Sequence, residues 1–564
     1  MKQIWIADSE PSTRFSLYTR GNTGEVFPRV ITALTGTLIG ADVRRAQDEL
    51  FVEMGAVHAK EVEPQGMGTG VFGGYLYGNA SLARLFGVRM PGANATTADE
   101  QVFGTLKDLP EYRRSKGDRS VLASFKLTIT ILGMMRSPDL TPLDVARADA
   151  TAWLATMPPL DTASDDELLA FVQTYPTRLG DSMKRLLHFS MMGSARFLLD
   201  RIVDGAGLPA GTTNRLVGGI DDVDSARLAQ GMWALGRIVA EDVSLTAAFD
   251  AGLDRIAERT DGTSLAVAMV DFLAKYGHRG PDEYELATPN WSMDPRPVYA
   301  AVDRLRHAPP DRDPGEITAR LQADQREALD LAMAKVGRMR RPMVRKSLAG
   351  SRAGGIARER AKDILVLENL GIRRALHELA RRAAERGGPT DLRKAFCITA
   401  DELAAFVADP ASFAAVIDER AQTERYLNDR VPPPWFDGII PNPSTWPLRT
   451  DAKAAAPASG TELSGIAVSG GRASGRARVI EDPADPRGLE AGEILVCAIT
   501  DPSWTPLFLG AAAVVCDTGA MMSHAAIVAR ELGIPAVLSV EGITSVADGT
   551  MLDVDGDTGT VRVG

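Results

Sequence analysis

The feature that most constrains this chain is a short stretch near its C-terminus, residues 518–537, where a polar loop leads directly into a brief helix. Ser523 is a typical N-cap residue, and Gly533 followed by Pro535 is a typical helix end. The stretch therefore predicts a short helix with His524 in its first turn. Free N–H groups at a helix start, together with the helix dipole, favour an anion such as a phosphoryl group. We expect His524 to be exposed and to carry phosphate.

The composition is that of an ordinary globular protein. The chain has 564 residues, of which 45% are hydrophobic and 24% charged, enough for several domains with ample cores. Its net charge of −11 argues against a nucleic-acid partner, and no apolar run reaches the ~20 residues of a membrane span. The first ten residues do not have the pattern of a signal peptide. We therefore expect a cytoplasmic protein without a nucleic-acid or membrane partner.

The cysteines do not indicate a metal site or a disulfide framework. Cys397, Cys497 and Cys516 are the three cysteines of the chain, and they are scattered rather than spaced as metal ligands. We therefore predict no metal site in this chain.

A linker is predicted at residues 451–462, because this segment contains small and polar residues without an apolar period. About ten extended residues span roughly 30 Å, so the domain that follows would be able to relocate. Ahead of the linker, helical periodicity is clearest at residues 165–172, 317–341 and 361–386. We predict a mainly helical domain at residues 1–450 and a small α/β domain at residues 463–564.

The predicted α/β domain contains short apolar runs separated by small turns. Strands are expected at residues 477–480, 493–497, 513–516, 535–540, 551–555 and 560–563. The last two runs flank a Gly-Asp-Thr-Gly turn and predict a hairpin. Thr505 followed by Pro506 predicts the start of another helix, with Thr505 as its N-cap.

Residues 463–564 resemble the swivelling phosphohistidine domain of phosphoenolpyruvate-utilising enzymes, a group that includes pyruvate phosphate dikinase, phosphoenolpyruvate synthase and rifampicin phosphotransferase. The resemblance runs from residues 465–470 through residues 500–506 to the histidine helix. It implies that His524 is the phosphorylated histidine, and we assign the phosphate loop to Thr518, Gly519 and Ser523.

The chain departs from the family pattern at two positions of this loop. The family's second glycine is replaced by Ala520, which bears on the loop geometry. The threonine often found two positions before the histidine, a regulatory site in some dikinases, is Met522 here. Regulation through that threonine is therefore not expected.

The upstream region is similar to the substrate-binding domain of rifampicin phosphotransferase and its relatives. Residues 22–35 resemble the opening segment of that domain, and residues 276–291 resemble a second family motif. Arg358, Glu359 and Lys362 fit an Arg-Glu-x-x-Lys pattern that faces the phosphoryl-transfer site in that family. The resemblance implies a mainly α substrate-binding domain followed by the small α/β swivelling domain.

Phosphoryl transfer needs cations that neutralise the phosphoryl oxygens and a base that accepts the acceptor's proton. Arg358 and Lys362 suit the first task, and Glu359 or His278 the second. On a helix, positions 358 and 362 share one face, whereas position 359 points about 100° away. Arg279 and Glu283, which follow His278 in the same motif, are candidate substrate-binding residues.

Each candidate also has a structural alternative. His524 would be a solvated residue at a helix start, and residues 278–281 would be a structural turn. Residues 358–362 would form a solvated helical face next to Arg373 and Arg374.

The ATP-grasp domain that phosphorylates the histidine in family dikinases has no counterpart in this sequence. The substrate-domain-like segment begins at about residue 20, and neither a Gly-rich phosphate loop nor a phosphoenolpyruvate-binding barrel is found elsewhere. We therefore predict a phosphotransferase component. A separate ATP-grasp protein, with ATP and Mg²⁺, would charge His524, which would then phosphorylate a hydroxyl of a small-molecule acceptor. No cofactor is expected on this chain itself.

Two alternatives remain open. The chain would be a non-catalytic ligand-binding or regulatory relative that has lost its kinase module, or a component of a phosphoenolpyruvate synthase or dikinase-like system.

Overall fold

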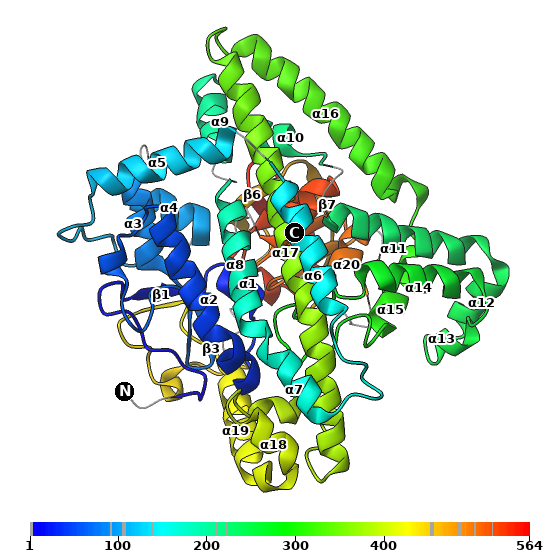
Figure 1. Cartoon of the computed structure of the whole chain (residues 1–564). Helices are drawn as coiled ribbons and strands as arrows, with labels where there is room; N and C mark the ends of the chain where they lie inside the picture. The colour runs from blue at the N-terminus through cyan, green and yellow to red at the C-terminus, as the bar shows by residue number, and fades with distance from the viewer. Residues whose placement is uncertain are drawn as a thin grey trace. The chain divides into compact units, whose positions relative to one another are not determined.

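The computed structural model describes residues 4–90, 93–103, 109–136, 139–192, 195–209, 211–220, 224–451, 456–481, 488–490, 492–500, 504–519, 521 and 523–564. The chain forms two compact units, each assembled from separated stretches of sequence (Figure 1). Unit 1 contains residues 1–191, 282–288 and 361–453. Unit 2 contains residues 192–281, 289–360 and 454–564.

Unit 1 is mainly helical. Its elements are β1 (Leu17–Thr19), α1 (Thr23–Val26), α2 (Ala33–Glu53), η1 (Ala59–Glu61), β2 (Gly70–Phe72), β3 (Tyr75–Asn79), α3 (Ala80–Arg89), α4 (Ala95–Phe103), α5 (Val121–Arg136), α6 (Thr141–Leu154), α7 (Asp165–Gln173), α8 (Tyr175–Met192), η3 (Leu392–Cys397), α18 (Leu403–Ala408), η4 (Pro410–Phe413), α19 (Ala414–Asn428), β4 (Trp435–Asp437) and η5 (Pro443–Thr445). The last residue of α8 already belongs to unit 2.

Unit 1 also contains a small antiparallel sheet that the sequence pattern did not predict. Within the described residues its strand order is β2-β3-β1-β4. The strands are only three to five residues long, and their alternation is hidden because both faces are largely buried. Aromatic packing holds the sheet together: Phe436 stacks on Tyr18 at 5.3 Å and meets Tyr77 edge-on at 5.1 Å.

Unit 2 combines a helical part with a C-terminal sheet. Its elements are α9 (Ala195–Gly205), α10 (Thr212–Val217), α11 (Asp224–Glu241), α12 (Val243–Asp250), α13 (Ile256–Arg259), α14 (Ser264–Tyr276), α15 (Arg296–Leu305), η2 (Pro310–Arg312), α16 (Pro314–Lys335), β5 (Glu462–Ser464), β6 (Ile466–Ser469), β7 (Arg472–Val479), β8 (Ile494–Cys497), α20 (Thr505–Gly510), β9 (Ala513–Cys516), α21 (His524–Glu531), β10 (Ala536–Leu538), η7 (Ile543–Ser545), β11 (Met551–Asp555) and β12 (Thr560–Val563). The long helix α17 (Arg341–Glu385) belongs to both units, and the boundary between them falls after Arg360.

The predicted long helices exist, but with different ends. The helix expected at residues 165–172 is confirmed as α7, where Ser164 and Glu167 form a capping box. The helix expected at residues 317–341 is α16, which stops at Lys335 because the chain turns extended at Val336. The helix expected at residues 361–386 is the second half of α17. Pro342 is tolerated there because it lies in the first turn of α17.

The C-terminal sheet confirms the predicted strands and adds others. Within the described residues its order is β5-β12-β11-β7-β8-β9-β10-β6, with parallel pairing from β7 through β10. The central strands β8 and β9 are buried along their whole length, as their unbroken apolar sequences predict. The predicted hairpin is confirmed as β11 and β12. Strands β5 and β6, and the first half of β7, were not predicted.

The coarse fold prediction is thus confirmed: helices dominate ahead of a small C-terminal α/β region. The proposed division at residues 1–450, 451–462 and 463–564 concerns independently moving parts and stays a prediction. Linker residues 452–455 lie outside the described residues. Among the described helices, none is both long and apolar enough to cross a lipid bilayer.

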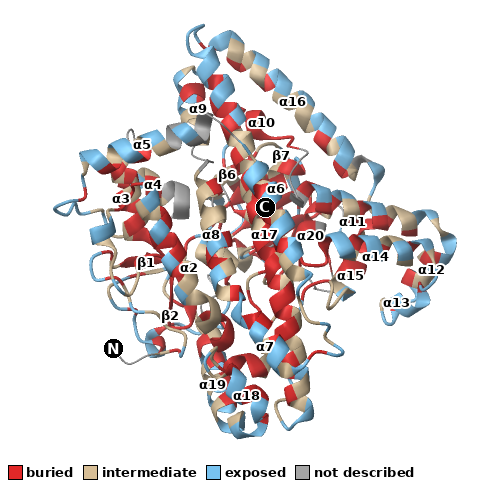
Figure 2. Ribbon diagram, viewed as in Figure 1, coloured by how far each residue is buried: buried red, intermediate tan, exposed pale blue. Residues whose placement is uncertain are grey.

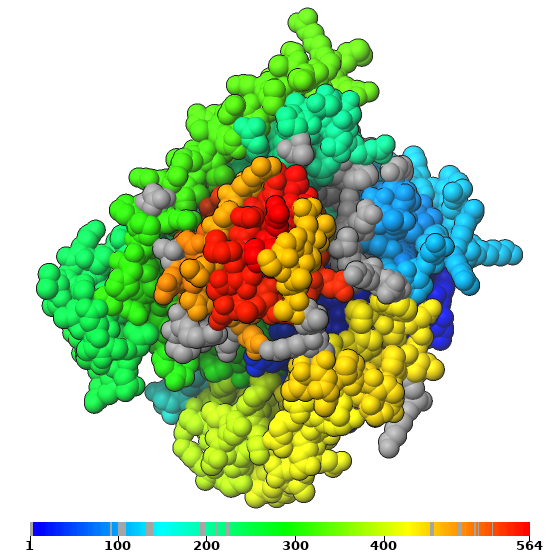
Figure 3. Space-filling model, turned by 180° about the vertical axis from the view of Figure 1, so that it is seen from behind, coloured from blue at the N-terminus to red at the C-terminus, as the bar shows by residue number. Residues whose placement is uncertain are grey.

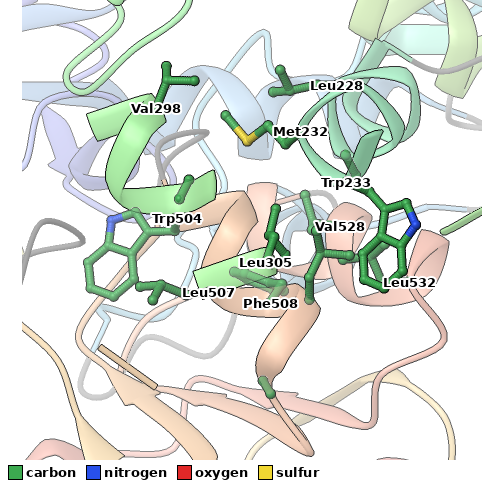
Figure 4. Close-up of a cluster of buried hydrophobic side chains, with 14 of the residues drawn as sticks. Leu228, Met232, Trp233, Val298, Leu305, Trp504, Leu507, Phe508, Val528 and Leu532 are labelled. Carbon is green, nitrogen blue, oxygen red and sulfur yellow. The ribbon is translucent and has the colours of Figure 1, made fainter. Parts of the chain in front are cut away.

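One hydrophobic cluster in unit 2 joins its helical part to the histidine domain, as we call residues 463–564. Helix α20 packs against α11 and α15, and α21 packs against α11 and α16. Figure 4 shows Trp504, Leu507 and Phe508 of the α20 segment gathered with Met232 of α11 and Leu305 of α15. Buried residues accordingly fill the centre of the C-terminal sheet and its helices (Figure 2). Other residues of the histidine domain lie at the surface seen in Figure 3.

Leu495 offers a test of this core, because it is fully buried in β8. The substitution Leu495→Ala removes apolar contacts and leaves a cavity, so we expect unit 2 to lose about 2–5 kcal/mol of unfolding free energy in urea denaturation. The matched control is Val243→Ala, at a position that is 87% exposed in the same unit. Equal effects of the two substitutions would contradict the described core.

Candidate functional site

His524 is the first residue of α21, at the carboxyl end of the parallel strands β8 and β9. Ser523 is the N-cap, as predicted, and its hydroxyl accepts the N–H of Ala526 at 3.3 Å. The prediction of an exposed imidazole is wrong, because the ring is half-buried. Phe508 of α20 covers one side of it, with ring centroids 6.0 Å apart in an edge-on arrangement.

Thr500 orients the imidazole. Its hydroxyl lies 3.0 Å from Nδ1 of His524, and the residue is only 4% exposed. Thr500 lies three residues after the end of β8, close to the carboxyl edge of the sheet. The bond occupies Nδ1 and leaves Nε2 as the nitrogen suited to attack phosphorus. In this arrangement Nε2 has no exposed surface.

The loop before His524 is held by backbone contacts. The N–H of Thr518 donates to the carbonyl of Ala498 at 3.0 Å, and the hydroxyl of Ser539 donates to the carbonyl of Gly519 at 2.6 Å. A Cβ at position 519 would lie 2.7 Å from a side-chain carbon of Leu538, so the close packing requires glycine there. Ala520 and Met522, the two departures from the family pattern, lie outside the described residues.

Arg530 lies on the histidine helix and was not predicted as a site residue. Its guanidinium turns back toward the start of α21 and donates to the carbonyls of Met521 and Ala526, each at 2.7 Å. The pKa of Arg530 is lowered to about 9, mainly by burial and also by the neighbouring cations Arg196 and Arg358. A charged side chain thus supports the loop that carries His524. The sequence signal was its position, since long helical side chains extend toward the helix N-terminus.

Arg358 and Glu359 lie in the part of α17 that belongs to unit 2. Glu359 is only 8% exposed, and its carboxylate lies 3.7 Å from the guanidinium of Arg358. The alternative of a solvated helical face is therefore wrong for these residues. Because Arg358 acts electrostatically on Arg530, the structure brings this predicted cation to the histidine helix.

Lys362 lies in the part of α17 that belongs to unit 1, and it is paired with Glu283. The ammonium lies 3.1 Å from a carboxylate oxygen, with 15% of the lysine and 1% of the glutamate side chain exposed. The side-chain amide of Asn369 donates to the carbonyl of Glu283 at 2.9 Å and fixes the segment. A predicted catalytic residue and a predicted substrate-binding residue are thus joined in one buried ion pair.

His278 and Arg279 follow α14 in unit 2, and each is 3% exposed. The carbonyl of Arg279 accepts the N–H of Trp291 at 2.9 Å, and the carbonyl of Gly277 accepts the N–H of Ser292 at 2.8 Å. This backbone pairing accounts for the buried turn. The role of His278 as a base and that of Arg279 in substrate binding stay predictions.

Within the described residues, no three histidine, cysteine, aspartate or glutamate side chains are grouped so that they could hold a metal ion.

Two segments match known protein families. Residues 185–359, which supply the helices α9 to α16 and the first part of α17, match the fourth domain of rifampicin phosphotransferase. Residues 489–559 match the mobile domain of PEP-utilising enzymes, and this segment includes His524, Thr500 and Arg530. The chain is rifampicin phosphotransferase-like. The predicted resemblance is confirmed by these matches.

Named relatives agree with this similarity. A prodigiosin-synthesizing transferase of Serratia marcescens is 32% identical over 394 residues, covering 67% of this chain and 43% of the relative. The rifampicin phosphotransferase of Bacillus subtilis is 29% identical over 320 residues, covering 55% of this chain and 36% of the relative. An uncharacterized protein of Mycobacterium tuberculosis is 27% identical over 585 residues, covering 99% of this chain and 62% of the relative. The rifampicin phosphotransferase-like chain therefore spans less than two thirds of the length of these relatives.

The Lys362–Glu283 pair gives a first prediction for the site. Lys362→Met removes the cation that lies 3.1 Å from the buried carboxylate of Glu283, so we expect a loss of about 3–5 kcal/mol of unfolding free energy. The double variant Lys362→Met with Glu283→Gln removes both charges and should recover most of that loss. Chemical denaturation of unit 1 measures both. The control is Lys394→Met, which breaks an exposed pair with Asp418 and should cost less than about 1 kcal/mol.

The Thr500–His524 bond gives a second prediction. If Nε2 is the nucleophile, the proton of the neutral imidazole resides on Nδ1, where Thr500 accepts it. Nitrogen-15 NMR of the labelled side chain should therefore show one dominant tautomer in the native protein. Thr500→Val should give a mixture of tautomers, whereas Thr500→Ser should keep the native spectrum. An unchanged spectrum in Thr500→Val would show that Thr500 does not orient the ring.

Proposed function

We propose that this chain is the phosphoryl-carrying and acceptor-binding component of a phosphotransferase. Nε2 of His524 attacks the β-phosphorus of ATP, an N–P bond forms, and the P–O bond to the departing AMP breaks. Water then attacks the γ-phosphorus and releases it as inorganic phosphate, so that a single phosphoryl group stays on His524. The acceptor's hydroxyl oxygen then attacks the phosphorus on His524, the N–P bond breaks, and the hydroxyl proton passes to Glu359 or His278. The observation that carries this proposal is the Thr500 hydrogen bond to Nδ1, made inside a segment that matches the mobile domain.

The remaining site residues have electrostatic roles in this proposal. The phosphoryl group in flight spreads negative charge over its outer oxygens, and fixed cations stabilise that charge. Arg358 supplies one such cation, and Arg530 holds the loop of Thr518 and Gly519 in place. Lys362 supplies a second cation to the acceptor, with Glu283 fixing its position.

The phosphoryl donor is proposed to be ATP, bound with Mg²⁺ by an ATP-grasp module outside these 564 residues. We take that module to be a separate subunit, which transfers the β-phosphoryl group as family dikinases do. The relatives are considerably longer than the part that matches this chain, which agrees with a division of labour between modules.

The acceptor is proposed to be a small molecule of the natural-product class with a free hydroxyl. Support comes from the names of two relatives, one a rifampicin phosphotransferase and the other a transferase that synthesises prodigiosin. Arg279 and Glu283 are proposed to border its binding site.

Charging of His524 is proposed to require movement of the histidine domain. Nε2 is shielded from solvent in the observed arrangement, so a donor cannot reach it without a rearrangement. The linker at residues 451–462 would permit that movement.

The test is transfer of labelled phosphate. The purified chain is incubated with candidate ATP-grasp proteins and with ATP labelled at either the β or the γ position. We expect an acid-labile label from the β position on the native chain and a loss of at least about 100-fold in His524→Ala, because the nucleophile is gone. The matched control is His307→Ala, at an exposed position.

Two results would overturn the proposal. One is the absence of label on the native chain with every partner tried, combined with binding of acceptors, which would favour a ligand-binding relative. The other is full labelling of His524→Ala.

A further inference from the structure

Glu531, the last residue of α21, is a carboxylate buried in the face that joins the histidine domain to the helical part of unit 2. It is 8% exposed, and Val528 and Leu532 of the same face belong to the shared hydrophobic cluster (Figure 4). Immediately beyond, a Cβ at Gly533 would lie only 3.5 Å from Leu321 of α16. The carboxylate therefore lies where the histidine domain meets the helical part, in hydrogen-bond contact with Ile220.

The carboxylate is poorly compensated for its burial. It offers about four acceptor sites, yet its one hydrogen bond among the described residues comes from the N–H of Ile220, at 2.9 Å. No lysine or arginine of the described chain forms an ion pair with it. Arg530 and Arg352 act on it electrostatically, but they donate to backbone carbonyls instead.

Burial of a charge without an ion pair costs free energy, because one N–H donor replaces a full shell of water. The apolar contacts of Trp504, Leu507 and Phe508 favour docking. The charge on Glu531 opposes them at the same interface.

We propose that Glu531 is a release residue: its buried charge weakens the docking of the histidine domain onto α11, α15 and α16, and so lets that domain leave. The inference rests on the proposed function for the need to leave, but the docking strength is a property that can be measured without any phosphoryl transfer.

The electrostatics have a definite sign. The pKa of Glu531 is raised from 4.5 to about 7: burial is the main cause and Glu359 adds to it, while the cations Arg530 and Arg352 and the N–H of Ile220 act in the opposite direction. Between pH 4.5 and 7, the carboxyl of Glu531 is therefore protonated in the docked state and ionised in the undocked state. Docking should be strongest near pH 5, weaken as the pH rises to 7, and stay constant above that.

Hydrogen–deuterium exchange of the full chain measures docking directly. The readout is the protection of peptides covering α10 to Ile220 and α21, corrected for intrinsic exchange rates, between pH 5 and 8. Glu531→Gln keeps an acceptor for the N–H of Ile220 but carries no charge. Since each pKa unit of difference is a factor of ten in the docking equilibrium, we expect about tenfold or greater protection over the native chain at pH 8. Its pH profile should be flat.

The matched control is Glu462→Gln, at an exposed position at the start of β5 in the same unit, which should leave the native profile unchanged. Protection in Glu531→Gln that equals or falls below the native level at pH 8 would overturn the proposal, since Glu531 would then be a clamp or a bystander. The proposal would also be overturned if the protection of the native chain did not decrease between pH 5 and 7. This second measurement uses the native chain alone, so it does not depend on the folding of a variant. Failure of histidine labelling leaves both results intact, so the two hypotheses fail separately.

Discussion

The interaction on which the rest of unit 2 depends is the apolar packing of α20 and α21 against α11, α15 and α16. Trp504, Leu507 and Phe508 are almost fully buried in it, together with Met232 and Leu305. The same contact places Phe508 against His524 and thereby sets how far the imidazole is covered. An imidazole at the border of a hydrophobic interface is partly protected from water.

Charged side chains are embedded at the edge of this apolar contact. Arg530 holds the histidine loop, Arg358 adds a second cation, and Glu531 remains a weakly compensated carboxylate. In such an interface the buried apolar area favours association of the two parts, and the buried charges change how strongly they associate.

The local sequence pattern predicted the position of the histidine helix correctly, because helix starts and ends are determined by residues only a few positions apart. Ser523 caps α21 and Gly533 follows its end, as predicted, and β8 and β9 coincide with unbroken apolar runs. The sheet of β1 to β4 escaped prediction, because strands of three to five residues that are buried on both faces carry no alternating pattern. Thr500 was part of a recognised motif, yet its bond to His524 spans 24 residues and exists only once the sheet is formed.

The sequence by itself determined the presence of a histidine at a capped helix start, the helical character of the preceding region and the resemblance to PEP-utilising enzymes. These follow from capping, periodicity and motif, which act over a few residues. Only the tertiary structure decided that His524 is half-buried, that Lys362 pairs with Glu283, and that Glu531 is enclosed beside Ile220. Burial and ion pairing depend on which distant segments share a core, and no local pattern specifies that choice.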